Sequence, residues 1–158
     1  MLRTEKKAAC LFNICRHRFY VDIGDVRYGF KEVEGVCVNI EATEYREGLD
    51  LTSAPRSIPG LVRYGPLVLR YGIAGNPINS DLWNWIKQTI EGNEQKRNVA
   101  VVVLDRKGNP VVKYALTGAW PSSWRLGRLD GLLGSPLLEE LVLQYEKLDI
   151  EYLKLSTQ

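Results

Sequence analysis

The sequence has few of the residues from which proteins build catalytic or metal sites. Its 158 residues include one histidine, His17, and three cysteines, Cys10, Cys15 and Cys37. Three cysteines cannot all pair within one chain, so a secreted disulfide framework is disfavoured and synthesis in a reducing cytoplasm is expected. These four residues lack the close paired spacing of a structural zinc site, and a catalytic triad would depend on His17 alone. We therefore expect no catalytic residues, no metal and no cofactor.

Long apolar runs and an excess of charge of one sign are missing as well. No stretch approaches the about 20 apolar residues that a spanning helix needs, so we expect no membrane-spanning segment. Residues 1–15 place basic residues before a short apolar patch, but no small-residue cleavage site follows, which disfavours a signal peptide. The 21 basic and 19 acidic residues are too balanced to argue for a nucleic-acid or acidic-membrane partner.

What the chain does contain is enough apolar material for one hydrophobic core. Its length fits one domain, and 45% of its residues are hydrophobic. Residues 1–17 lack a clean period and are predicted to form an N-terminal arm. We predict a β domain at residues 18–150 and a C-terminal tail at residues 151–158.

Alternating apolar and polar residues predict several strands. Residues 18–24 alternate and end at a glycine turn, so residues 26–33 are predicted to return as the second strand of a hairpin. Residues 98–104 (NVAVVVL) are apolar on both faces, which predicts a strand covered by the core on one side and by the helix or a neighbouring subunit on the other. Its predicted partner is the strand at residues 110–117, after which Trp120–Trp124 is expected to cap the sheet.

Two segments have helical features. Residues 80–91 (SDLWNWIKQTIE) place their apolar side chains on one broad face and precede Gly92, which predicts a helix packed on a sheet. Residues 137–148 (LLEELVLQYEKL) favour a helix by propensity. A period of two would instead place Leu141 and Leu143 on one face of a strand, and the residues alone leave this choice open.

The clearest strand leads into an unusually long connection. In residues 35–45, Val38 and Ile40 share one face while polar side chains occupy the other, so we expect one core face and one wet face. The chain then leaves the sheet for residues 46–60 and returns in residues 61–71, whereas hairpins usually close in two to five residues. Because this loop exposes aliphatic side chains, it predicts contact between subunits.

Several short motifs occur in order along most of the chain: FYVDI with GFKEVEGV, EYREG, PGLVRY, LWNWI, LDRKGNPV and AWPSSW. In this order the sequence resembles the tail tube family of contractile phages and phage-derived injection systems. The resemblance implies a mainly β (α+β) fold, either a β-barrel or a two-sheet sandwich with one packed α-helix, and it favours a strand over residues 137–148. It also implies a structural subunit, not an enzyme, that forms hexameric rings stacked into the inner tube of a contractile tail.

The resemblance further implies partners and contact residues. The expected partners are other copies of the chain, the sheath, the baseplate and tube-initiator or terminator proteins, with DNA or an effector protein passing through the lumen of a phage tail or injection-system particle. A baseplate tube initiator of the same fold remains open, and the four tryptophans keep a small-ligand-binding β-barrel as a weaker alternative. The loop corresponds to the family's segment between rings or subunits. The predicted contacts are Glu47, Leu49, Leu51, Arg56 and Ile58, and the predicted lumen residues are Asn39, Glu41 and Thr43.

Overall fold

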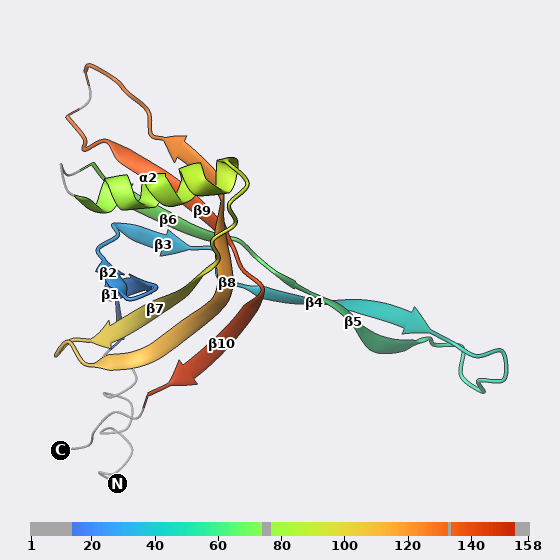
Figure 1. The fold of residues 1–158 in the computed structure, drawn as a ribbon. Coiled ribbons are helices and arrows are strands. Elements are labelled where there is room, and N and C mark those ends of the chain that lie inside the picture. Colours follow the sequence, from blue (N-terminus) through green and yellow to red (C-terminus); the bar gives the residue numbers. More distant parts are fainter. Residues whose placement is uncertain (1–13, 74–76, 133, 154–158) are drawn as a thin grey trace, which may run out of the picture.

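The structure, a computed structural model, describes residues 14–73, 77–132 and 134–153. Residues 1–13 of the predicted arm and 154–158 of the predicted tail lie outside this range. The described part is mainly β with one helix, which confirms the predicted fold class (Figure 1). In chain order, the elements are β1 (Ile14–Ile23), β2 (Val26–Tyr28), β3 (Glu32–Glu34), β4 (Val38–Tyr45), β5 (Arg56–Tyr64), β6 (Leu67–Gly72), α2 (Pro77–Ile90), β7 (Arg97–Asp105), β8 (Pro110–Leu126), β9 (Leu138–Gln144) and β10 (Lys147–Tyr152).

Strand β8 organises the body of the molecule because it belongs to two antiparallel half-sheets. Its first half pairs with β7 on one side and β10 on the other, and its second half pairs with β9. The first half-sheet continues from β7 to β1 and β2, and the second continues from β9 to β6 and β3. Figure 1 shows β8 as the long curved strand between them. Within the described residues, the strand order is open at β2 and β3.

The bend of β8 lies at Gly118. This residue has a φ of 68°, a conformation that glycine adopts readily and other residues rarely adopt, so the strand can bend there without ending. The prediction that the strand ends at residue 117, with Trp120–Trp124 as a cap, was therefore wrong. Those residues form the second half of β8. The predicted strand at 137–148 is confirmed as β9 and β10, which follow one edge of β8 and are separated by two residues opposite the bend.

The predicted return strand at residues 26–33 was wrong in its extent, because the chain crosses between the half-sheets there. Its first part, β2, pairs with β1, but its last part, β3, pairs with β6. Between them, the ring of Phe30 packs edge-on against Tyr71 with centroids 5.7 Å apart, and the Lys31 N–H donates to the Arg70 carbonyl at 2.9 Å. These contacts hold the segment against the second half-sheet.

The hydrophobic core is formed by both half-sheets and α2. Strands β6 and β9 bury every second side chain, as a pleated strand covered on one face does. Strand β7 also buries Val102 on its other face, so the expectation of cover on both sides holds for this residue. The largest contributions come from Val21, Ile23, Tyr28, Leu67, Leu69, Leu82, Trp85, Val99, Leu116, Leu141 and Leu143.

Helix α2 is anchored through Trp85. It begins three residues before the predicted helix because Pro77 occupies its first position, where the missing N–H costs nothing. Gly92, with a φ of 84°, follows its end. The indole N–H of Trp85 donates to the Gln95 carbonyl at 2.7 Å, and the Arg97 guanidinium lies 4.8 Å from the ring centre. The helix thus packs on the sheet as predicted.

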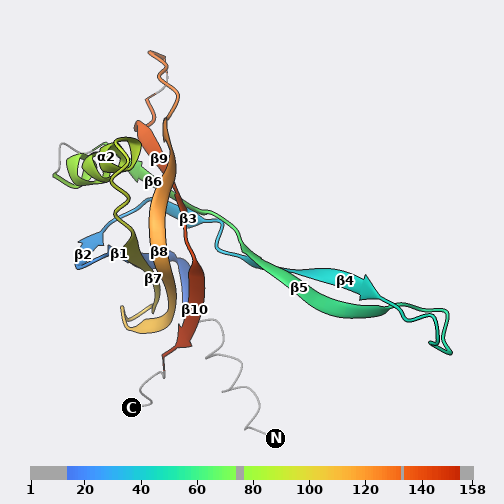
Figure 2. The same ribbon diagram turned by 45° about the vertical axis from the view of Figure 1, so that its right-hand side comes forward.

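Strands β4 and β5 form a separate two-stranded ribbon that extends away from the body (Figures 1 and 2). The predicted core face of residues 35–45 was wrong: Val38 and Ile40 are 49% and 61% exposed. Among the described residues nothing covers either face, since all of β4 and all of β5 except Tyr64 are exposed. The return strand begins at Arg56, where the pairing with Tyr45 starts, so the connecting loop is residues 46–55 and shorter than predicted.

Candidate subunit interface

The ribbon leaves the body at a tightly packed neck. The Gly65 N–H donates to the Cys37 carbonyl at 2.9 Å, which closes the base of the ribbon. Gly35 has a φ of 94°, and a Cβ at this position would overlap the carbonyl oxygen of Pro66. Only glycine fits both the backbone conformation and the space at this point. The direction in which the ribbon projects is therefore set by the body.

Tyr145 links the neck to the core. Its hydroxyl donates to the Cys37 carbonyl at 3.5 Å, and its ring lies 5.6 Å from that of Tyr64 at the end of β5. Burial raises the pKa of the Tyr145 phenol, so the group keeps its proton and remains a donor at neutral pH. Strand β9 and its following residue thus fix the ribbon from the side of the core.

The stem of the ribbon, formed by the paired strands β4 and β5, has two different faces. Because directly paired residues share a face, Val38, Ile40 and the Ile40 partner Val62 form an apolar face. All three are about half exposed. A two-stranded hairpin is only marginally stable in water, and an exposed apolar patch typically marks an interface. The apolar face would therefore be stabilised by a partner that covers it.

The predicted lumen residues lie together on the opposite face of the stem. Asn39 pairs with Arg63 across the ribbon, and Thr43 pairs with Ile58. Glu41 forms an ion pair with Arg63 at 2.5 Å on this face. Both partners are largely exposed, so this pair stabilises little. All of β4 is exposed, so exposure does not separate these residues from their apolar neighbours, and their lumen position stays a prediction.

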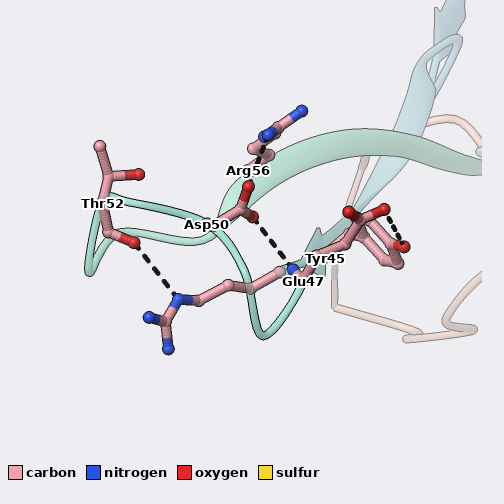
Figure 3. Close-up of polar contacts among 6 residues, drawn as sticks. Tyr45, Glu47, Asp50, Thr52 and Arg56 are labelled. Atoms are coloured by element: carbon pink, nitrogen blue, oxygen red, sulfur yellow. Dashed lines mark hydrogen bonds and ion pairs between the residues drawn. The ribbon is translucent and has the colours of Figure 1, made fainter.

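The tip of the ribbon is ordered by its own polar groups (Figure 3). The Asp50 carboxylate accepts a hydrogen bond from the Glu47 N–H at 3.0 Å and pairs with the Arg56 guanidinium at 2.7 Å. Arg46 Nε donates to the Thr52 carbonyl at 3.3 Å across the same loop. The role of Asp50 was missed from the sequence, because a lone aspartate in a polar loop gives no sign of which N–H it accepts from.

Two leucines at the tip have no such internal contacts. Leu49 is 93% exposed and Leu51 is fully exposed, whereas Asp50 between them binds the Glu47 N–H and the Arg56 guanidinium. We call Leu49 and Leu51 the tip leucines. Of the predicted contact residues, the structure brings Glu47, the tip leucines and Arg56 together at the tip and places Ile58 on the stem. Their contact role stays a prediction.

Residues 14–73, 77–132 and 134–153 contain neither a cluster of metal ligands nor a helix that could span a membrane. No group of three or more histidine, cysteine, aspartate or glutamate side chains in these residues could hold a metal ion. The one helix in the same range is too short and too polar to cross a membrane. The described residues thus form a packed body and a ribbon that pairs only with itself.

Residues 16–149, most of the chain, match the family described as T4-like virus tail tube protein gp19. The chain belongs to this family and is a structural tail tube protein. A comparison of the sequence with curated proteins finds no match.

Solved structures share the fold. A chain of the PVC sheath-tube complex, an extracellular contractile injection system in the extended state, aligns with a TM-score of 0.81 at 20% identity, covering 95% of this chain and 99% of that one. A chain in the structure of the anti-feeding prophage (AFP) tube-terminating cap aligns with a TM-score of 0.81 at 21% identity, covering 97% of this chain and 100% of that one. Hcp1 from Flavobacterium johnsoniae aligns with a TM-score of 0.59 at 16% identity, covering 84% of this chain and 94% of that one. At these identities, the likeness shows the fold.

Proposed function

We propose that copies of this chain assemble into hexameric rings, which stack into the inner tube of a contractile tail or injection system. The observation that carries the proposal is the exposed ribbon, whose apolar stem and tip leucines have no partner among the described residues. A surface that projects from one copy and fits elsewhere on the next makes a heterologous contact, which closes into a ring or continues along a tube. Obligate assemblies of this kind bury more than about 2,000 Å².

The two faces of the stem support a division of roles. The apolar face of Val38, Ile40 and Val62 would pack on neighbouring copies, and the polar face of Asn39, Glu41 and Thr43 would line the water-filled bore. DNA or an effector protein would pass through this bore. The role is mechanical, and we propose no catalytic step and no cofactor.

Sheath, baseplate and terminator proteins are the proposed partners of the tube. The support is the shared fold with chains of a sheath-tube complex and of a tube-terminating cap. The protein would be made in the cytoplasm and become part of the particle. A second candidate is a tube initiator at the baseplate, because a chain of the AFP baseplate also shares the fold, with a TM-score of 0.74 at 24% identity.

The experiment is to concentrate the full chain and measure its assembly by negative-stain microscopy and light scattering. We expect rings and, at high concentration, tubes; rings that never extend would favour the initiator. The double variant Ile40→Asp/Val62→Asp should remain folded but fail to assemble, because both positions are exposed on the stem. Val26→Asp is the control, since Val26 is equally exposed on the body. A wild-type chain that stays monomeric in every buffer would contradict the proposal.

A further inference from the structure

The body carries an uncharged groove between α2 and the second half of β8. Its volume is about 390 Å³, and we call it the tryptophan groove. The edge of Trp83 meets the ring of Trp124 with centroids 5.4 Å apart, so the two elements fix the walls of the groove. The full lining is Trp83, Ile86, Thr89, Ile90, Trp120, Pro121, Ser122, Ser123 and Trp124.

The groove exposes several large apolar side chains to solvent. Ile90 is 72% exposed, and Trp83, Trp120 and Trp124 are each exposed by a third or more. The Ser122 hydroxyl donates to the Val142 carbonyl at 3.2 Å, so this polar group is satisfied within the sheet. Exposed aromatic rings around a hollow are typical of binding surfaces, where large rigid side chains bury much area at low entropic cost.

The chemistry of the lining selects an uncharged occupant. Two other hollows on the body carry charges: Arg16 and Glu34 line one, and Asp25, Asp81 and Arg97 line the other. An aliphatic occupant of those two would take charged groups out of water, among them the Arg97–Asp81 and Arg70–Glu34 ion pairs, and would offer them no polar contact in return. The tryptophan groove has no such group, so an aliphatic side chain can fill it without that penalty.

The tip leucines match this groove. They are the most exposed large apolar side chains of the ribbon, and Asp50 between them is bound to the Arg56 guanidinium and the Glu47 N–H. Figures 1 and 2 both show the tip at the far end of the ribbon, away from α2, so a tip cannot enter the groove of its own chain. We infer that the tip leucines of one copy bind in the tryptophan groove of a second copy. This inference rests on the proposed assembly and names the surface that receives the ribbon.

A charge-swap experiment tests the inference. Leu51→Glu places a carboxylate in the groove of the next copy, and Ile90→Lys places an ammonium there, so each variant alone should lower assembly affinity by about tenfold or more. Both positions are exposed, and a lysine suits the end of a helix. Combined in one chain, the two changes should restore assembly, because the new charges pair between copies. Leu51→Glu with Val26→Lys is the control and should not be rescued.

A cross-link provides a second readout that does not depend on affinity. In a background with Cys10, Cys15 and Cys37 changed to serine, Leu51→Cys and Ile90→Cys are placed in one chain. Mild oxidation of the assembly should give covalent dimers and higher multimers, whereas the pair Leu51→Cys and Val26→Cys should give none.

The outcomes separate the two proposals. An assembly that forms normally, with no rescue by the charge pair and no cross-link between the two positions, would overturn the groove inference and leave the tube proposal standing. A wild-type chain that never assembles would overturn both. Rescue together with the cross-link would support the groove as the receiving surface.

Discussion

The body and the ribbon are built from similar strands but are stabilised in different ways. In β9 of the body, Leu141 and Leu143 alternate with Glu140, Val142 and Gln144, and both leucines are fully buried. In β4 of the ribbon, Val38 and Ile40 alternate in the same way, yet both are about half exposed. The pattern of a strand thus shows which face is apolar. It does not show whether the cover of that face lies in the same chain or in another.

The neck is where the two regions are coupled. Gly35 and Gly65 allow the close approach of the backbone, and Tyr145 joins it to the core. A stable body therefore holds a weakly stable ribbon in a defined direction. This arrangement lowers the cost of ordering the ribbon on a partner, because part of the conformational entropy has already been lost.

The largest expected difference is between matched core and ribbon truncations. Leu141→Ala should lower the free energy of unfolding of the single chain by about 2–5 kcal/mol, because it leaves a cavity in the core. Ile40→Ala should change it by less than about 0.5 kcal/mol, because Ile40 is exposed. Urea denaturation of dilute protein measures both. Equal effects would show that the ribbon is part of the cooperative core.

The second prediction compares two glycines with positive φ. Gly35→Ala and Gly108→Ala should each cost about 1–2 kcal/mol for the backbone conformation. A methyl group on Gly108 meets open space, whereas one on Gly35 overlaps the Pro66 carbonyl. Gly35→Ala should therefore cost more in thermal denaturation and should also abolish assembly by redirecting the ribbon. If Gly108→Ala impairs assembly as strongly, the neck does not orient the ribbon.

The third prediction concerns how Asp105 makes the stability of the body depend on pH. The Asp105 carboxylate accepts hydrogen bonds from the N–H groups of Asn109 and Lys107, both at 2.8 Å, and these bonds, led by the one from Asn109, lower its pKa. A lowered pKa means that the carboxylate stabilises the fold above about pH 4 and loses this contribution as the pH falls through the folded-state value. Asp105→Ala should lower the melting temperature at pH 7 and flatten its decrease in acid. An unchanged pH profile would contradict this role.

The smallest expected effect on stability belongs to the tip. Asp50→Ala removes the ion pair with the largely exposed Arg56 guanidinium and the hydrogen bond from the Glu47 N–H. Both contacts lie within the tip, so the change should leave the melting of the body unchanged. Assembly should nevertheless weaken, because the loop no longer holds the tip leucines in place. Asp149→Ala, which removes an exposed pair with Lys147 on the body, is the control for charge. Equal assembly of both variants would show that the order of the tip is not needed.

Much of the fold could be predicted from local pattern. The strand at residues 18–24 and the helix at 80–91 follow from their periodicity, and the strand at 98–104 follows from its continuous apolar run. The strand over residues 137–148 was decided by the family resemblance, since its propensity favours a helix and its pairing with β8 and β6 lies far away in sequence.

The candidate interface could be predicted only in part. The loop after residue 45 was recognisable by its length and its exposed leucines. Its true extent, the role of Asp50 and the exposure of the apolar stem could not be predicted, since they depend on strand register and on the direction of the neck. The contribution of Trp120 and Trp124 to a groove was missed for a similar reason, because the sequence does not show that β8 continues past Gly118.

The sequence by itself determined the β-rich class, the amphipathic helix and the absence of a recognisable catalytic motif, because these depend on residue type and near-neighbour spacing. Only the tertiary structure decided that one strand serves both half-sheets and that the ribbon stands apart from them. Such features arise from contacts between distant residues and from backbone bends at single glycines. An alternating pattern is the same whether the apolar face of a strand is buried within its own chain or exposed, and only the tertiary structure distinguishes the two cases.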